Sequence, residues 1–206
     1  MTIAKRIMHI LPDANTKRIT GMKATLFTTI LFLLISLPGY STIRYVKAGN
    51  PTPSYPYTTW ATASDSIQKV VDICLSGDTI LIGTGVYPQI VNSEHYGRGL
   101  TILGVDIDSC IIDVSGFPLE PLLKVFRFTD DLTIKNLTFK TRLGTTEHIA
   151  IYTFGPTFGY NIVNITNVNF IGMFREAVAL LKTSGSIQNS YFYASTMAIG
   201  GPEWTS

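Results

Sequence analysis

The sequence predicts an all-β fold in which successive coils of the chain stack in register as a parallel β-helix. Three observations lead to this prediction. The unit Ile-x-Asn-x-x-Phe occurs at 134–139, 165–170 and 187–192, and its steps of 31 and 22 residues are typical of a stacked repeat. Short β-branched runs fill the chain after residue 78 without a helix between them, which disfavours helix–strand crossovers. The hairpin signals Asn-Gly and Asp-Gly do not occur between these runs.

Residues 1–41 are predicted to form a secretory signal peptide. An apolar run at 24–37 follows several basic residues and ends shortly before Ser41, where small residues make a cleavage site. The run is shorter than the about 20 apolar residues that a membrane span needs. We therefore expect an extracellular or cell-envelope protein with no stable membrane span after cleavage. An uncleaved anchor is the alternative, and Met22 is an alternative start of the chain.

The composition indicates one packed domain, because 46% of the 206 residues are apolar and 15% are charged. The formal charge of +2 depends on the N-terminal segment. Removal of residues 1–41 leaves 11 basic and 13 acidic residues, a net charge of −2. Because this remaining chain also has no cluster of Lys or Arg, nucleic acid is excluded as a partner.

Residues 42–63 are predicted to form a short N-terminal strand followed by a loop. Ile43 and Tyr45 alternate with Arg44 along the strand, so that they share one of its faces. The rest of the segment is rich in Pro, Tyr and Thr, a composition that excludes regular structure.

Residues 64–77 are predicted to form an amphipathic capping helix. A single apolar stripe has the spacing i, i+3, i+4, i+7 and i+8, at Ile67, Val70, Val71, Cys74 and Leu75. Asp65 and Gln68 match a capping box at the start, and Gly77 matches the left-handed residue that follows many helices. A helix with one apolar face requires a flat apolar surface beneath it.

Residues 78–206 are predicted to form the β-helix coils, with the recurring Asn at a corner of each coil. Asn adopts positive φ at low cost, and its side-chain amide can bond to the Asn of the next coil. The predicted structural ladder consists of Asp113, Asn136, Asn167 and Asn189. The inward Phe residues of the repeat predict an aromatic stack of Phe139, Phe170 and Phe192. Because the sequence stops at "GGPEWTS" without a second capping element, we expect the set of coils to be incomplete.

Cys74 and Cys110 lie among apolar neighbours, and we interpret them as two small buried side chains. An exported chain also permits a disulfide, so pairing of the two thiols stays open as an alternative. The sequence contains no information on the distance between them.

A succession of motifs runs through the chain in the order "RYVKAGN", "SDSIQKVVDICLSGDTILIGTGVYPQIV", "LTILG", "CIIDVSG" and "LTIKNLTF". It resembles the N-terminal part of secreted right-handed parallel β-helix proteins of the pectin-lyase-like superfamily. In that family a capping helix leads into a Gly-Asp-Thr-Ile strand and a Gly-x-Tyr turn, which correspond here to 77–80 and 85–87. The resemblance covers roughly residues 43–200 and implies a right-handed coil. It does not select a function, because the family includes lyases, esterases, hydrolases, epimerases and adhesins.

The outward positions of the aligned strands are polar. They form a predicted glycan-facing strip of Thr133, Lys135, Asn164, Thr166, Ser186 and Gln188. A calcium-dependent lyase requires several carboxylates on such a strip, and this strip carries none. We therefore predict hydrogen bonding to sugars without a metal ion or other cofactor.

Other acid–base candidates are interpreted as structural. Asp130 and Asp131 form the best carboxylate pair for glycoside hydrolysis, but adjacent residues of an extended segment point to opposite sides, so a solvated turn is preferred. His95 and His148 each follow a Glu and are interpreted as exposed loop residues, because no nucleophile lies beside them. Two further carboxylates, Asp106 and Asp108, are too few for a calcium site.

These observations predict the N-terminal fragment of an exported β-helix protein. Its expected role is a cell-surface or extracellular scaffold that interacts with carbohydrate and has no catalytic residues in this segment. The alternative, implied by the resemblance, is a polysaccharide lyase, pectinesterase or glycoside hydrolase whose catalytic coils lie beyond residue 206. An outward cluster of Asp, Arg or Lys on consecutive coils would distinguish the enzyme from the scaffold.

Overall fold

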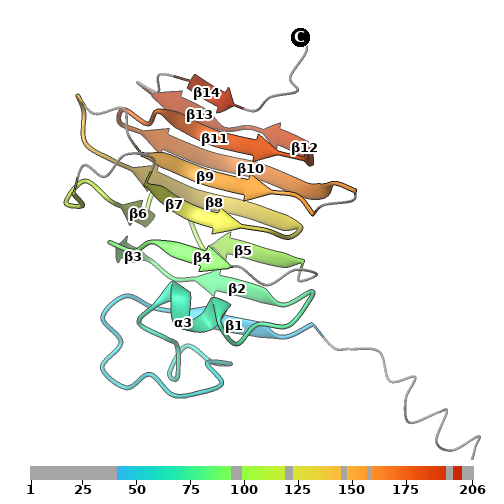
Figure 1. The fold of residues 1–206 in the computed structure, drawn as a ribbon. Coiled ribbons are helices and arrows are strands. Elements are labelled where there is room, and N and C mark those ends of the chain that lie inside the picture. The colour runs from blue at the N-terminus through green and yellow to red at the C-terminus, as the bar shows by residue number, and fades with distance from the viewer. Residues whose placement is uncertain are drawn as a thin grey trace, which may run out of the picture. The chain divides into compact units, whose positions relative to one another are not determined.

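A computed structural model describes residues 41–93, 99–118, 123–144, 148–156, 159–193 and 197–200, which belong to one compact unit. Most of these residues form β-strands, and one short helix, α3 (Ile67–Val71), interrupts them (Figure 1). The strands belong to two sheets, and every strand pair is parallel. The prediction of an all-β fold with parallel pairing is therefore confirmed.

The larger sheet has nine strands, six of which follow one another along its main path. In spatial order these are β1 (Ile43–Val46), β2 (Thr79–Ile82), β5 (Leu100–Gly104), β8 (Leu132–Lys140), β10 (Asn161–Ile171) and β12 (Thr183–Gln188). Three shorter strands continue it beyond a corner, namely β3 (Gly85–Tyr87), β6 (Cys110–Asp113) and β13 (Tyr191–Tyr193). The long strands β8 and β10 run through this corner without a break.

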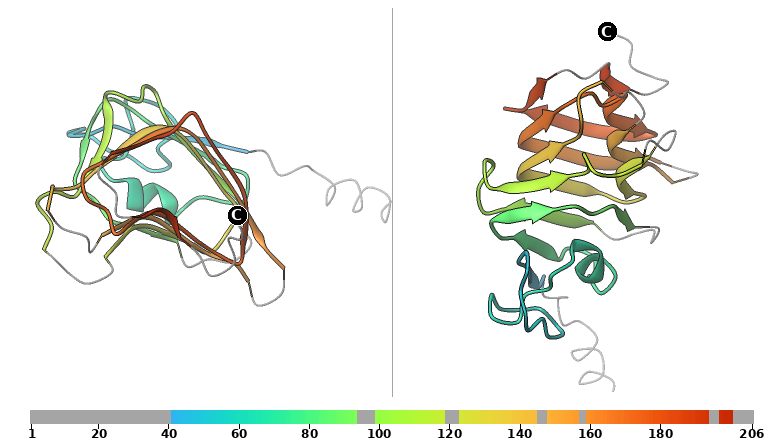
Figure 2. Two further views of the ribbon diagram at one scale, coloured as in Figure 1. Left: turned by 90° about the horizontal axis from the view of Figure 1, so that it is seen from above. Right: turned by 90° about the vertical axis from the view of Figure 1, so that its left-hand side faces the viewer.

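The second sheet has five strands, which the chain enters between its passages through the first sheet. In spatial order these are β14 (Met197–Gly200), β11 (Glu176–Leu181), β9 (Ile149–Phe154), β7 (Lys124–Phe128) and β4 (Val91–Ser93). The chain passes from the first sheet to the second and back, and each return places the next strand beside the previous one. Seen down the stack, the strands of successive levels overlay one another (Figure 2).

The register of the stack can be followed along one column of the first sheet. Thr79, Thr101, Thr133, Asn164 and Ser186 lie opposite one another on successive strands, at intervals of 22, 32, 31 and 22 residues. The unequal intervals show that loops of different length are inserted into coils whose strands nevertheless stay aligned. Parallel pairing permits this, because the strands alone set the spacing of about 4.8 Å between levels.

The core lies between the sheets and consists of aligned apolar columns. On each strand, the residue that follows the Thr, Asn or Ser of the outer column points inward. Four isoleucines at these inward positions are fully buried: Ile80, Ile102, Ile134 and Ile165. A second column is aromatic. The rings of Phe139 and Phe170 stack with centroids 5.6 Å apart, and those of Phe170 and Phe192 with centroids 4.9 Å apart.

The helix is shorter than the predicted range 64–77 and begins differently. Ser66, not Asp65, is its N-cap, and the Ser66 hydroxyl accepts from the backbone N–H of Lys69. Asp65 instead forms an exposed ion pair with Lys69 at 3.0 Å, which raises the pKa of the Lys69 ammonium.

The helix ends early because a backbone N–H group after Val71 donates to a side chain and not to a helical carbonyl. The Asp78 carboxylate accepts from the backbone N–H of Leu75 at 2.9 Å, so this N–H does not continue the helix. Leu75 was predicted to belong to the apolar stripe, but 65% of it is exposed. Ile67, Val70 and Val71 are buried and pack in the common core. Gly77 does have a positive φ, +86°.

The first strand is held by a buried ion pair. Arg44 Nε donates to Asp78 Oδ2 at 3.2 Å, and both residues are largely buried. The second carboxylate oxygen of Asp78 accepts from the backbone N–H of Thr42 at 2.8 Å. Arg44 therefore points inward while Ile43 and Tyr45 share the outer face of β1, where 48% of Ile43 is exposed.

Candidate ligand-binding surface

The outer face of the first sheet carries two adjacent rows of polar side chains. One row contains Thr133, Asn164 and Ser186, and the other contains Lys135, Thr166 and Gln188, with each row in strand-to-strand register. These six residues form the strip that the sequence predicts. They alternate with buried residues along β8 and β10, because successive side chains of a strand point to opposite faces.

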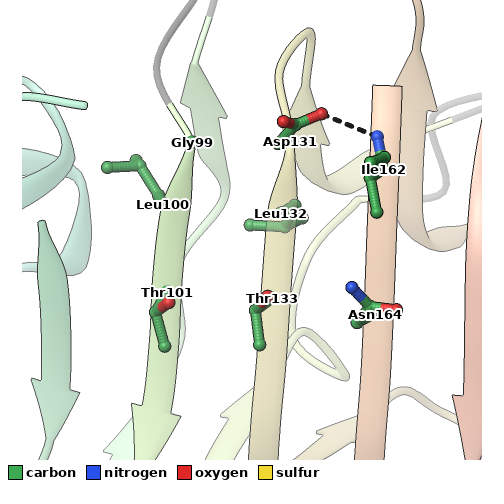
Figure 3. Close-up of a pocket in the computed structure, with 8 residues that line it drawn as sticks. All are labelled: Gly99, Leu100, Thr101, Asp131, Leu132, Thr133, Ile162 and Asn164. Atoms are coloured by element: carbon green, nitrogen blue, oxygen red, sulfur yellow. Dashed lines mark hydrogen bonds between the residues drawn. The ribbon is translucent and has the colours of Figure 1, made fainter. Parts of the chain in front are cut away.

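The first row extends beyond the predicted strip. Thr101 on β5 lies opposite Thr133, and Thr79 on β2 lies opposite Thr101, so that five successive strands present a hydroxyl or amide group at the same position. Figure 3 shows Thr101, Thr133 and Asn164 aligned on neighbouring strands. The Ser186 hydroxyl donates to Asn164 Oδ1 at 3.0 Å, which fixes the orientation of the Asn164 amide.

A shallow open depression of about 220 Å³ lies over the middle of this row, on β5, β8 and β10 (Figure 3). Its lining comes from three neighbouring strands and consists of Gly99, Leu100, Thr101, Asp131, Leu132, Thr133, Ile162 and Asn164. Asp131 Oδ1 accepts from the backbone N–H of Ile162 at 2.7 Å. The depression thus combines hydroxyl, amide and carboxylate groups with the exposed aliphatic side chain of Ile162.

Asp131 agrees with its interpretation as part of a solvated turn, because it is exposed and lies between β7 and β8. It also lies two residues before Thr133 and therefore on the same outer face as the strip. Its neighbour Asp130 is buried, with 3% of its surface exposed, so the solvated-turn interpretation is wrong for Asp130. The two carboxyl groups differ in burial and do not form a hydrolytic pair across a common ligand site.

Asp131, Thr101 and Ile162 are residues of the depression that the sequence analysis did not place there. The two-residue alternation that selected Thr133 also leads back to Asp131, and "LTILG" contains the Thr of the preceding coil. Asp131 and Thr101 could therefore both have been placed from the sequence. Ile162 carried no such signal, because an apolar residue on an outer face looks like a core residue in sequence.

The asparagine column forms the corner between the two parts of the first sheet. Asn136, Asn167 and Asn189 have φ values of +55°, +56° and +49°. Asn167 Nδ2 donates to Asn136 Oδ1 at 2.9 Å, and the strand register places Asn189 in line with them. The three residues therefore shape the scaffold beside the strip and do not face the depression.

Asp113 does not belong to this column, contrary to the prediction. It lies opposite Lys140, four residues beyond Asn136, and its carboxylate is 3.2 Å from the Lys140 ammonium. The position next to Asn136 on the preceding coil is Gly104, where a Cβ would clash with the Asn136 carbonyl oxygen. Burial tends to raise the pKa of Asp113, but hydrogen bonds from Ser115 and the nearby Lys140 outweigh it and lower that pKa.

His148 is buried, so its interpretation as an exposed loop residue is wrong. Its Nε2 donates to the carbonyl of Pro118 at 3.2 Å, and its Nδ1 pairs with the Thr141 hydroxyl at 2.9 Å. The ring thereby ties two loops together and does not face a ligand site. His95 lies outside the described residues.

Tyr87 is another buried polar residue with a structural role. Its hydroxyl donates to the carbonyl of Gly83 at 2.7 Å and accepts from the backbone N–H of Ala48 at 3.2 Å. Burial raises the pKa of Tyr87 to about 12. The phenol therefore stays neutral at physiological pH and links the N-terminal loop to the first coil.

The cysteines and the carboxylates suggest no further centre. Cys74 and Cys110 are both buried thiols, and the Cys110 thiol lies 3.3 Å from the carbonyl oxygens of Ile82 and Gly83. Within the described ranges, no three His, Cys, Asp or Glu side chains are grouped so that they could hold a metal ion. Asp106 accepts from the Ser109 hydroxyl at 2.7 Å, in a local turn.

None of the helices in the described part of the chain is long and apolar enough to cross a membrane. Comparison with protein-family models, with curated proteins and with solved structures finds no match to this chain.

Proposed function

We propose that the stack is a right-handed parallel β-helix, with α3 covering its N-terminal end. The parallel ladders, the alternation of the chain between two sheets and the left-handed asparagine corners support this architecture. The right-handed sense follows from a general rule, because crossover connections between parallel strands of a sheet are right-handed in about 98% of cases. The burial of Ile67, Val70 and Val71 supports the role of α3.

We further propose that the protein is exported and that its strip binds a polysaccharide. The observation that carries the proposal is the row Thr79, Thr101, Thr133, Asn164 and Ser186, which presents one hydroxyl or amide group per coil on an open face. Sugar hydroxyls both donate and accept hydrogen bonds, and Thr, Ser and Asn side chains do the same. Export rests on the predicted signal peptide at 1–41.

The rigidity of the scaffold favours binding of an extended ligand. The first four residues of the row are flanked on their strands by buried residues and are held by parallel pairing on both sides: Thr79, Thr101, Thr133 and Asn164. A ligand would therefore meet groups that are already in place, so little conformational entropy of the protein is lost on binding. A repeating polymer suits this surface, because both the row and the polymer present equivalent groups at regular intervals.

Binding is a better-supported function than catalysis for this surface. Among the eight residues that line the depression, Asp131 is the one carboxylate, and none is a His, Lys or Arg. Glycoside hydrolysis requires two carboxyl groups on opposite sides of the bond that is cleaved. The described lining lacks such a pair, so we propose a carbohydrate-binding scaffold and not a polysaccharide-degrading enzyme.

The test is a binding survey with the full chain against neutral and acidic polysaccharides immobilised on an array, followed by titration calorimetry with soluble fragments. We expect binding to at least one polysaccharide. The double variant Thr133→Val and Asn164→Ala should weaken it at least five-fold, because each change removes a hydrogen-bonding group from the row.

Asn169→Ala is the matched control, because Asn169 lies on the same strand as Asn164 but beyond the corner at Asn167. Its affinity should equal that of the unchanged protein. The proposal is wrong if the full chain binds none of the polysaccharides, or if the double variant and the control bind equally well.

A further inference from the structure

Aromatic side chains lie at one end of the second row of the strip. Tyr45 on β1 lies opposite Leu81, Leu81 lies opposite Leu103, and Leu103 lies opposite Lys135. Paired residues of neighbouring strands point to the same face of a sheet, so Tyr45 shares its face with the strip. Trp60 packs on Tyr45, with ring centroids 4.7 Å apart and an interplanar angle of 67°. The aromatic pair and the polar strip therefore lie on the same face, with Leu81 and Leu103 between them.

Trp60 is exposed and yet held in place. Its exposed fraction is 40%, so a large part of the indole is accessible to a ligand. A Cβ added at Gly83 would lie 2.9 Å from Trp60 Cζ3, so the indole occupies the space that this glycine leaves open. The ring is thus supported by Gly83 on one side and by Tyr45 on another.

The loop that carries Trp60 is itself fixed to β1. The backbone N–H of Tyr45 donates to the carbonyl of Tyr57 at 2.7 Å, and the N–H of Ser64 donates to the carbonyl of Tyr45 at 2.9 Å. Asn50 Nδ2 donates to the carbonyl of Ala63 at 2.6 Å. Because both ends of the segment around Trp60 are tied down, the indole is pre-positioned for a ligand and its immobilisation costs little on binding.

The chemistry of this surface matches a sugar chain. A pyranose ring presents C–H groups on its faces and hydroxyls around its edge, so it can stack on an indole while its edge bonds to polar side chains. Lys135 and Asp131 are the two charged residues among the strip and the lining of the depression, and their charges cancel. This balance favours a ligand without net charge.

We propose that Trp60, supported by Tyr45, is a stacking site for one sugar residue of a neutral oligosaccharide that lies across the strands, from Tyr45 towards Gln188. The inference rests on the proposed function and adds the place, the direction and the charge class of the ligand. The row crosses six strands, β1 to β12, and thus spans about 24 Å at the usual strand spacing. A chain of several sugar residues is needed to cover it.

The test uses the intrinsic fluorescence of Trp60. Trp60 and Trp204 are the two tryptophans of the chain, so Trp204→Phe in the full chain leaves Trp60 as the single reporter. The probes are hexasaccharides of glucose, mannose and xylose, with hexagalacturonate as the acidic comparison. We expect at least one neutral hexasaccharide to shift the Trp60 emission to shorter wavelength with a saturable dependence on concentration.

The variant Trp60→Ala should weaken the affinity for that hexasaccharide about ten-fold in calorimetry, as is usual for removal of an aromatic anchor. Trp60→Phe should weaken it less, because a smaller ring remains. Tyr55→Ala is the control: Tyr55 belongs to the same loop and is 72% exposed, but its ring pairs with Tyr57 and not with Tyr45. Melting temperatures check that all three variants are folded.

The outcomes separate this inference from the proposed function. If a hexasaccharide binds with unchanged affinity to folded Trp60→Ala, or binds without changing the Trp60 emission, the stacking site is wrong and the polysaccharide-binding function stands. Tighter binding of hexagalacturonate than of every neutral probe overturns the charge class. If the unchanged protein binds none of the polysaccharides, both proposals fall together.

Discussion

The first coil and the last described coil of the stack differ in how their outer strands are covered. The edge of β1 is paired with the loop at 47–64, and its core residue Val46 is fully buried. On β12 and β13, by contrast, Ile187 and Phe192 are only partly buried, and 59% of Tyr191 is exposed. Both coils use the same strand register, so the difference comes from what packs on them.

In a stacked fold, the stability of each coil depends on its neighbours on both sides. An interior coil gains hydrogen bonds and apolar contacts from the levels above and below, whereas an outer coil gains them from one side only. At the N-terminal end, the loop at 47–64 pairs with the outer edge of β1, and the ion pair of Arg44 with Asp78 holds this strand. The side chains of β12 and β13 are exposed or half-buried, so we expect local opening to begin at these strands.

The largest expected effect is a difference in the free energy of unfolding between two variants of the phenylalanine column, one in an interior coil and one in the last described coil. Phe170→Ala should lower the free energy of unfolding by about 3 to 5 kcal/mol, because it leaves a cavity in a fully buried aromatic column. Phe192→Ala should cost about 1 to 2 kcal/mol, because Phe192 is only partly buried. Urea denaturation of both variants measures the difference. Equal losses would contradict the contrast between the coils.

The second effect tests the covered end directly. Asp78→Ala should lower the free energy of unfolding by about 3 kcal/mol, because it leaves Arg44 as an uncompensated buried charge and frees the N–H groups of Thr42 and Leu75. Denaturation monitored by circular dichroism measures it. The matched control is Asp65→Ala, which removes an exposed ion pair and should cost less than about 0.5 kcal/mol. A similar small loss for Asp78→Ala would mean that the ion pair does not secure this end.

The smallest effect concerns the corner residues. Asn167→Ala should cost about 1 to 2 kcal/mol, because alanine strains the left-handed backbone and loses the hydrogen bond to Asn136. Asn189→Ala should cost less, because the neighbouring strands β12 and β13 contain only exposed or half-buried side chains. Asn167→Gly separates the two causes, since glycine keeps the backbone conformation and removes only the side chain. If thermal denaturation ranks Asn189→Ala as the more damaging change, the expected gradient along the stack is wrong.

Local signals in the sequence were sufficient for the features that repeat in three successive coils. The unit Ile-x-Asn-x-x-Phe marks positions that must be inward and apolar, or must tolerate positive φ, whatever the loops do. The corner conformations of Asn136, Asn167 and Asn189 and the stacked rings of Phe139, Phe170 and Phe192 lie at those positions. The strip follows from the same alternation, because every second residue of a strand faces outward.

Two residues whose positions were predicted wrongly, Asp113 and His148, lie outside the repeated unit Ile-x-Asn-x-x-Phe. Asp113 was aligned with the asparagines by local similarity, but the loop before β6 shifts its register to Lys140. His148 was assigned to an exposed loop, yet two loops close over it and bond both ring nitrogens. Sequence patterns contain no information on which loops meet, because such contacts join residues that are far apart in the chain.

What the sequence by itself determined is the parallel all-β class and the column to which each residue of the unit Ile-x-Asn-x-x-Phe belongs. These depend on short-range periodicity and on the backbone preferences of single residues. Only the tertiary structure decided that Ile162 lines the depression, that Arg44 is buried against Asp78, and that Trp60 packs on Gly83 beside the same face. Those contacts arise when coils of unequal length are brought into register, and the hydrogen bonds between coils set that register.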